Sequence, residues 1–128
     1  MAIEFNTNLV HARLAEITAA IDAGAGAGIF IAYDGVRPAK GGPGTNTLVS
    51  TTFSDPSFPA PSGEAITANA ITPGTVTMAG TWTWWRVTDS DSNFVMDGDV
   101  VDLTTNETVL SIGDNFEITS FVLNGGNT

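Results

Sequence analysis

The chain has 128 residues, which is enough to bury the core of one domain without disulfides or metals. Fourteen acidic residues against four basic ones give a net charge of −10, which argues against direct binding to nucleic acid or to an anionic membrane. The sequence has no cysteine and one histidine, which excludes thiol chemistry and argues against histidine-based catalysis and metal binding. We therefore expect no enzymatic activity and no cofactor.

The first predicted element is an amphipathic helix over residues 7–23. The apolar residues of its stripe recur at intervals of four, three and four positions, as on one helical face: Val10, Leu14, Ile17 and Ile21. The Gly/Ala-rich segment 24–28 follows, either as a hinge or as a place where two backbones pass closely. We expect residues 1–28 to form this helix and joint, and residues 29–128 to form a β domain, within one structural domain overall.

After residue 28 the pattern changes to short apolar runs separated by turn residues. Seven or eight strands are predicted, over the runs 29–34, 47–53, 65–71, 75–88, 93–97, 100–103, 109–112 and 115–123. Strands at this spacing are typical of a β-sandwich or a small barrel, of the jelly-roll or immunoglobulin-like kind. The expected fold class is therefore mainly β, with the N-terminal helix covering one end or edge of a single sandwich or barrel.

The run 75–88 is the longest predicted strand, and its side chains alternate between two faces. The face expected to point at the core carries Val76, Met78, Gly80, Trp82, Trp84 and Arg86. Trp85 lies on the other face among threonines, so we expect it to be exposed. It is then either a lone surface aromatic or the anchor of an interface between subunits, and we favour the interface.

Two arginines of this acidic chain are expected to be held by partners. Arg37 precedes a proline in a turn-rich loop, and an acid of its own chain or of a neighbouring subunit is its expected partner. Arg86 lies beside Trp84 on the predicted inner face, so it requires a carboxylate or an aromatic face.

The segment DSDSN (89–93) places oxygen-bearing side chains at alternate positions, as at the start of a calcium loop. The glycine that such a loop needs at its sixth position is Phe94 here, and the glutamate at the twelfth is Val100. A hairpin turn with an acidic rim is the favoured interpretation. Weak binding of a cation by this segment is the alternative, with the ligands Asp89, Asp91 and Asn93.

Several short motifs follow one another along the chain. After the helix and joint come GVRPA (35–39), Thr-Leu-Val (47–49), Ala-Ile-Thr-Ala-Asn-Ala (65–70), Gly-Thr-Trp (80–82) and WRVTDSDSNFVMDGDV (85–100). This ordered set resembles a family of small virion proteins of tailed bacteriophages, and the resemblance covers most of the chain. It implies a β-rich structural protein of the particle, above all a capsid decoration (cement) protein on the outer surface of the head.

The resemblance implies the major capsid protein as partner, and we expect self-association, with a homotrimer as the favoured state. The residues that we expect at interfaces are Trp85, Arg37, Val10, Leu14 and Ile17. The alternative function is that of a tail-fibre, baseplate or head–tail component that binds a receptor or a glycan. In that case Trp84 and Trp85, with nearby Asp and Asn side chains, would form a platform for a sugar ring.

Overall fold

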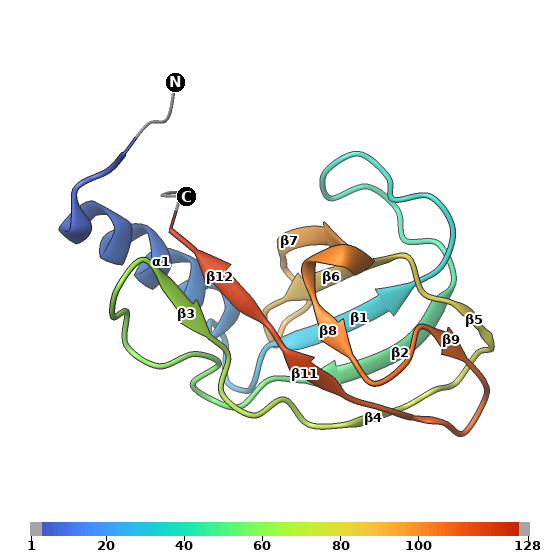
Figure 1. The fold of residues 1–128 in the computed structure, drawn as a ribbon. Helices are drawn as coiled ribbons and strands as arrows, with labels where there is room; N and C mark the ends of the chain where they lie inside the picture. Colours follow the sequence, from blue (N-terminus) through green and yellow to red (C-terminus); the bar gives the residue numbers. More distant parts are fainter. Residues whose placement is uncertain (1–3, 126–128) are drawn as a thin grey trace.

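The computed structural model describes residues 4–125, which form one α-helix and twelve short strands (Figure 1). The helix α1 spans Thr7–Ile21, and a 3-10 turn spans Val100–Asp102. The strands are β1 (Ile29–Tyr33), β2 (Thr47–Thr52), β3 (Ala65–Thr67), β4 (Gly74–Thr75), β5 (Gly80–Thr81), β6 (Trp84–Thr88), β7 (Phe94–Asp99), β8 (Thr104–Thr105), β9 (Val109–Leu110), β10 (Asn115–Phe116), β11 (Ile118–Ser120) and β12 (Val122–Asn124). The expectation of a mainly β fold with one N-terminal helix is confirmed.

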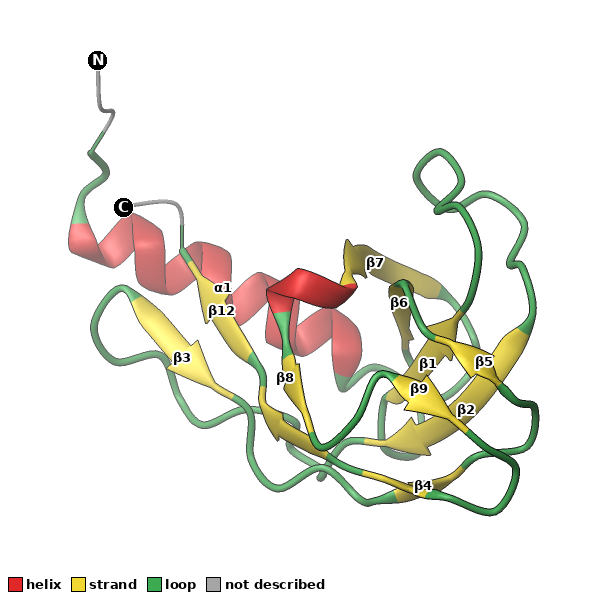
Figure 2. Ribbon diagram, turned by 45° about the vertical axis from the view of Figure 1, so that its right-hand side comes forward, coloured by secondary structure: helices red, strands yellow, loops and turns green. Residues whose placement is uncertain are grey.

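The largest sheet has four antiparallel strands in the order β2-β1-β6-β7. The remaining strands pair two by two, as β3–β12, β4–β10, β5–β9 and β8–β11. In Figures 1 and 2, β8 and β11 lie in front of the four-stranded sheet, β5 and β9 lie at its right-hand end, β4 runs below it, and β3 and β12 lie in front of the helix α1. The pairs form the second layer of a small β-sandwich. The core lies between the layers, where the ring of Phe30 from β1 stacks on that of Phe116 from β10, with 6.3 Å between centroids. Phe121, between β11 and β12, packs edge-on against the same ring.

The helix packs on this core. It begins after Asn6, whose side chain accepts a hydrogen bond from the backbone N–H of Asn8. Val10 and Leu14 are fully buried in the same cluster as the residues of the sheet, and Ile17 is partly buried against that cluster. Val10 and Leu14, expected at an interface, are therefore interior residues of this structure. With 15 residues, α1 is too short and too polar to cross a membrane, and it is the only α-helix of residues 4–125.

The Gly/Ala joint is a place of close backbone passage. A Cβ atom on Gly24 would lie 2.2 Å from the hydroxyl oxygen of Ser90. That hydroxyl donates a hydrogen bond to the carbonyl of Ala23 and accepts one from the backbone N–H of Gly26. The joint is thus held against the turn between β6 and β7, which favours this interpretation over a hinge.

The prediction of one long strand over 75–88 is wrong, because this part of the chain forms three short strands, β4, β5 and β6. The predicted faces also differ from the observed ones: Met78, expected in the core, is 45% exposed, and Trp85, expected at the surface, is 5% exposed. The ring of Trp85 lies 5.1 Å from that of Phe121, and its indole N–H donates to the carbonyl of Asp99. Trp85 is therefore a core residue and not the anchor of a subunit interface.

Strand β6 is buried on both faces, which explains this error. The second layer covers the face that carries Trp85, while the loop between β1 and β2 (residues 34–46, the β1–β2 loop) lies over the opposite face. On that opposite face Trp84 stacks on Tyr33 with 4.2 Å between ring centroids. Both tryptophans are thus inside the protein, and the expected platform of Trp84 and Trp85 for a sugar ring is wrong.

Candidate functional site

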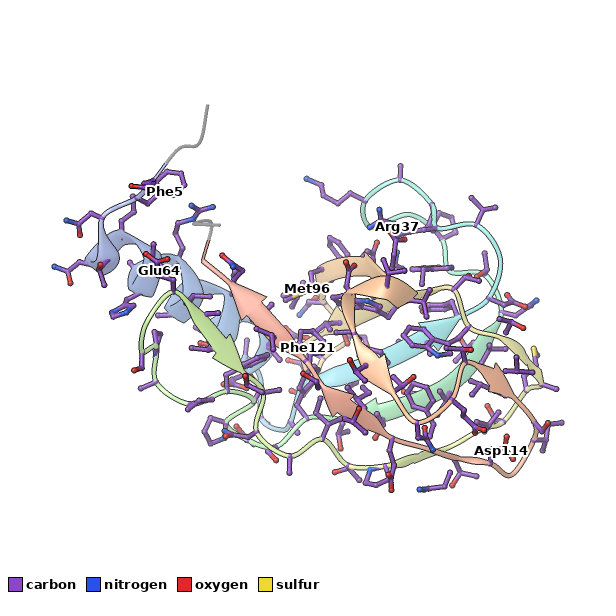
Figure 3. The ribbon with its side chains drawn as sticks, viewed as in Figure 1. Phe5, Arg37, Glu64, Met96, Asp114 and Phe121 are labelled. Atoms are coloured by element: carbon purple, nitrogen blue, oxygen red, sulfur yellow. The ribbon has the colours of Figure 1, made fainter. Side chains whose placement is uncertain are left out.

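An open groove lies beside β7, the last strand of the four-stranded sheet. Within residues 4–125 no strand pairs with the outer side of β7. The groove has a volume of about 490 Å³ and separates β7 from the β1–β2 loop. Its lining residues are Arg37, Pro38, Ala39 and Lys40 from the loop and Phe94, Val95, Met96 and Asp97 from β7; we call it the β7 groove. Figure 3 shows Arg37 on the loop and Met96 near β7.

A fixed ion pair includes Asp97, one of the residues that line the β7 groove. Arg86 on β6 faces Asp97 on β7 in the sheet register, and their side chains are 12% and 4% exposed. The guanidinium donates twice to the carboxylate, from Nε to Oδ1 at 2.7 Å and from Nη2 to Oδ2 at 3.0 Å. The hydrogen bond to Asp97 raises the pKa of Arg86, so this side chain stays charged. The expected need of Arg86 for a carboxylate partner is confirmed.

Aromatic rings surround the same guanidinium. Its central carbon lies 5.2 Å from the ring centroid of Trp84 and 5.4 Å from that of Phe94. Nη2 also donates to the carbonyl of Gly42 at 2.7 Å, which ties the β1–β2 loop to the sheet. Because the guanidinium and the carboxylate satisfy each other and the loop, neither group is free to take part in chemistry.

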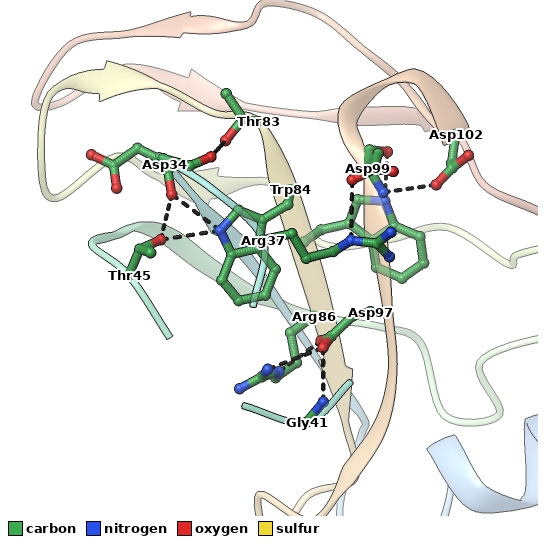
Figure 4. A network of polar contacts seen from close by, with 12 residues as sticks. Asp34, Arg37, Gly41, Thr45, Thr83, Trp84, Arg86, Asp97, Asp99 and Asp102 are labelled. Atoms are coloured by element: carbon green, nitrogen blue, oxygen red, sulfur yellow. Dashed lines mark hydrogen bonds and ion pairs between the residues drawn. The ribbon is translucent and has the colours of Figure 1, made fainter. Parts of the chain in front are cut away.

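The β1–β2 loop is attached to β7 at two alternate residues (Figure 4). The backbone N–H of Gly41 donates to Asp97, and Nε of Arg37 lies 3.2 Å from a carboxylate oxygen of Asp99. Arg37 thus pairs with an acid of its own chain, as one of its two expected partners. The side chains of this second pair are 41% and 49% exposed, so the pair contributes only about 0–1 kcal/mol to stability.

The base of the loop is held more firmly than its tip. The carbonyl of Asp34 accepts hydrogen bonds from the indole N–H of Trp84 and from the hydroxyl of Thr45. The Asp34 carboxylate accepts from the backbone and the side chain of Asn46. These contacts fix both ends of the loop, so that residues 37–40 form a rim at a set distance from β7.

The surroundings of the β7 groove combine exposed apolar side chains with one unpaired cation. Val36 and Val101 are each 86% exposed, and each lies close in sequence to a member of the Arg37–Asp99 pair. Phe94 is 39% exposed. Among the described residues, Lys40 has no acidic partner within 4.0 Å. The groove can therefore bind a chain that offers both apolar side chains and a carboxylate.

The DSDSN segment forms the turn between β6 and β7. One carboxylate oxygen of Asp89 accepts the backbone N–H groups of Asp91 and Asn93, and the other accepts the side-chain amide of Asn93. These hydrogen bonds, led by that of the Asn93 side chain, lower the pKa of Asp89. Because Asp89 already has donors at both oxygens, the interpretation as a hairpin turn is confirmed. Residues 4–125 contain no cluster of three or more His, Asp or Glu side chains that could hold a metal ion.

Of the five residues expected at an interface, only Arg37 lies in the β7 groove. Trp85, Val10 and Leu14 are in the core, and Ile17 packs against it. The apolar run of β7 and the cation Lys40 were not singled out by sequence reasoning. No local signal marks them, because the position of a strand at the edge of a sheet depends on pairing between distant segments.

Comparison of the chain with protein-family models, with curated proteins and with solved structures finds no match. The resemblance to phage virion proteins therefore stays a prediction.

Proposed function

We propose that this protein is a non-enzymatic structural component of a tailed-phage particle, a decoration protein that binds the major capsid protein on the outside of the head. The observation that carries the proposal is the β7 groove, where an unpaired strand edge lies beside exposed apolar side chains. Such a surface suits a protein that works by attachment to a larger assembly. The ordered motifs of the sequence supply the link to virions.

The use of charged residues near the groove supports the same function. The charged side chains of Asp97 and Arg86 bind each other and hold two strands and a loop together. The carboxylate of Asp102 is likewise used within the chain, because it accepts a hydrogen bond from the backbone N–H of Asp99. What the groove offers to the outside is therefore backbone, apolar surface and one lysine. These are elements of recognition, and they fit a binding module.

The net charge of −10 suits a protein on the outer surface of a particle. Neighbouring particles that carry many copies would repel one another, and free DNA would be repelled from the shell. A component of the tail, baseplate or neck shares these properties, and copy number separates it from a decoration protein.

The experiment is quantitative mass spectrometry of purified particles of the virus that encodes the chain. We expect a copy number comparable with that of the major capsid protein, and density over the outside of the head in images of the particles. A few copies per particle would move the protein to the tail or the neck. Its absence from purified particles would contradict the proposal as a whole.

A further inference from the structure

We propose that the β7 groove binds an extended segment of a partner protein as an added strand, and that a carboxylate of this segment pairs with Lys40. Only the identity of the partner, as the major capsid protein, rests on the proposed function. The mode of binding rests on the edge of the sheet, on the lining of the groove and on its charges.

The backbone of β7 provides the first argument. In an antiparallel pair, each strand directs alternate N–H and C=O groups to its partner and the others to the opposite side. Since β6 is the only strand that pairs with β7 in the described chain, the outer backbone groups in the first part of β7 can bind an extended peptide. At its end, the N–H of Asp99 is taken by Asp102 and its C=O by the indole of Trp85. The pairing shifts by one residue between Met96 and Phe94, so Val95 has no partner on β6.

The lining of the groove provides the second argument. The edge strands of many sheets are protected by a charged side chain that points outward. The one charge in the middle of β7 is Asp97, which is 4% exposed and is neutralised by Arg86. On β7 the groove is therefore lined by the exposed ring of Phe94 and by Val95 and Met96, which are partly buried against the core, opposite Pro38 and Ala39 of the loop.

The charges select the occupant. Two of the four basic residues of the sequence, Arg37 and Lys40, line the β7 groove, and a third, Arg86, pairs with its lining residue Asp97. Arg86 is saturated by Asp97 and Arg37 is paired with Asp99, which leaves Lys40 as the cation available to a ligand. A segment with one carboxylate complements this site. A second copy of the chain, paired through β7 with this β7, is disfavoured because it would bring together two chains of charge −10. If the two grooves overlapped, it would also place Lys40 against Lys40.

The test uses short synthetic peptides with alternating Thr and Val and one central Glu, and sister peptides with Gln or Lys in its place. We expect the Glu peptide to bind best, and its contacts to appear as shifts of the backbone amide signals of β7 and of residues 37–40 in NMR spectra. Shifts confined to another surface, or equal affinity for the three peptides, would overturn the proposal.

Two variants and a matched control make the test specific. Lys40→Glu should weaken binding of the Glu peptide by about fivefold and remove its advantage over the Lys peptide. Arg13→Glu makes the same change of charge on α1, away from the groove, and should leave the affinity within about twofold of the wild type. Equal effects of the two substitutions would show that only the overall charge matters, and would overturn the role of Lys40.

Val95→Pro alters the edge itself at the residue that has no partner on β6. We expect the variant to stay folded, with a Tm that is lowered because the side chain of Val95 packs against the core, and to lose most of its affinity for the Glu peptide. Dimers of the free wild-type protein that Val95→Pro converts to monomers would show that a second copy fills the groove, against the proposal. Peptide binding in a protein that is absent from virus particles would leave this inference standing and remove only the proposed function.

Discussion

Arg86 and Asp97 join two strands through a pair of charges that water barely reaches. Taking both charges out of water has a large unfavourable free energy, and the two hydrogen bonds between them offset it. If one partner is removed, the other stays in place without compensation. The pair therefore does more to fix the register of β6 and β7, and the position of the β1–β2 loop, than to raise the net stability of the protein.

We predict that Asp97→Asn lowers the free energy of unfolding by about 3–5 kcal/mol, because it leaves the guanidinium of Arg86 buried without a counter-charge. Urea unfolding followed by tryptophan fluorescence measures this change. Arg37→Gln is the matched control, since it removes the exposed pair with Asp99 and should lower the stability by no more than about 1 kcal/mol. Losses of equal size in the two variants would contradict the distinction between the pairs.

A second prediction at the scale of single residues concerns Asp89 in the turn between β6 and β7. The pKa of this carboxyl is lowered in the folded state below its usual value of 3.8, first by the side-chain amide of Asn93 and then by its backbone N–H. Its ionised form therefore stabilises the fold above pH 3.8, and this contribution is lost as the pH falls through the lower pKa of the folded state. Asp89→Asn should unfold at lower urea concentration than the wild type at pH 7.

The pH dependence is the sharper part of this test. Unfolding curves of wild type and Asp89→Asn, recorded from pH 7 downward, should approach each other as the pH falls from 3.8 through the lower pKa of the folded state, because the wild-type carboxyl is protonated over this range. Asp91→Asn serves as the control, since the hydrogen bonds of this turn use the carboxylate of Asp89. A difference between wild type and Asp89→Asn that stays constant down to low pH would contradict the role of the charge.

Among the elements, the helix α1 carries both buried and exposed leucines within one short segment. Leu14 is fully buried in the core, and Leu9 on the same helix is 47% exposed. We predict that Leu14→Ala lowers the free energy of unfolding by about 2–5 kcal/mol, since it removes methyl groups from the core and leaves a cavity. Leu9→Ala, the matched control, should change it by about 0.5 kcal/mol or less. Thermal unfolding of the two variants side by side provides the measurement.

The opposite result would have a definite meaning. If Leu14→Ala unfolded like the wild type, the buried face of the helix would not be part of the core. The first expectation from the sequence, in which Val10 and Leu14 contact another subunit, would then return.

The elements also differ in how well the sequence predicts them. The helix was predicted over 7–23 and spans Thr7–Ile21, because a stripe of apolar residues with helical spacing depends only on local geometry. The strands predicted over 29–34 and 47–53 agree with β1 and β2 to within a residue at each end. The prediction for 75–88 failed because the alternation of apolar and polar side chains identifies the inner face of a strand only where its other face is exposed to water.

The candidate site was less predictable than the fold. The arginine in the groove could be inferred, because an arginine next to a proline in an acidic chain is expected to be held in place. The groove itself is formed by a loop and a strand that are more than 50 residues apart, as the hydrogen bond between Gly41 and Asp97 shows. Their proximity follows from the order of strands in the sheet, which no local pattern encodes.

At the scale of the whole molecule, one core connects the helix with both layers of strands. Val10 and Leu14 from α1, Phe30 from β1 and Phe121 near the C-terminal end of the described chain belong to one cluster of buried residues. The helix adds its apolar face to this cluster, and the glycine at residue 125 lets the last described segment approach it closely: a Cβ there would lie 2.2 Å from Val10. The division into residues 1–28 and 29–128 therefore describes the sequence better than it describes the packing.

This shared core leads to a prediction about cooperativity. The three tryptophans are 0–5% exposed, all within the β portion, so their fluorescence reports the packing of the two layers. The far-UV circular dichroism of α1 reports the helix. Because the helix loses its buried partners when the layers separate, we expect the two signals to change at the same urea concentration and with the same slope. A helical signal that disappears at lower urea concentration, while the tryptophans stay buried, would show that residues 1–28 fold as a separate unit docked on an independent β domain.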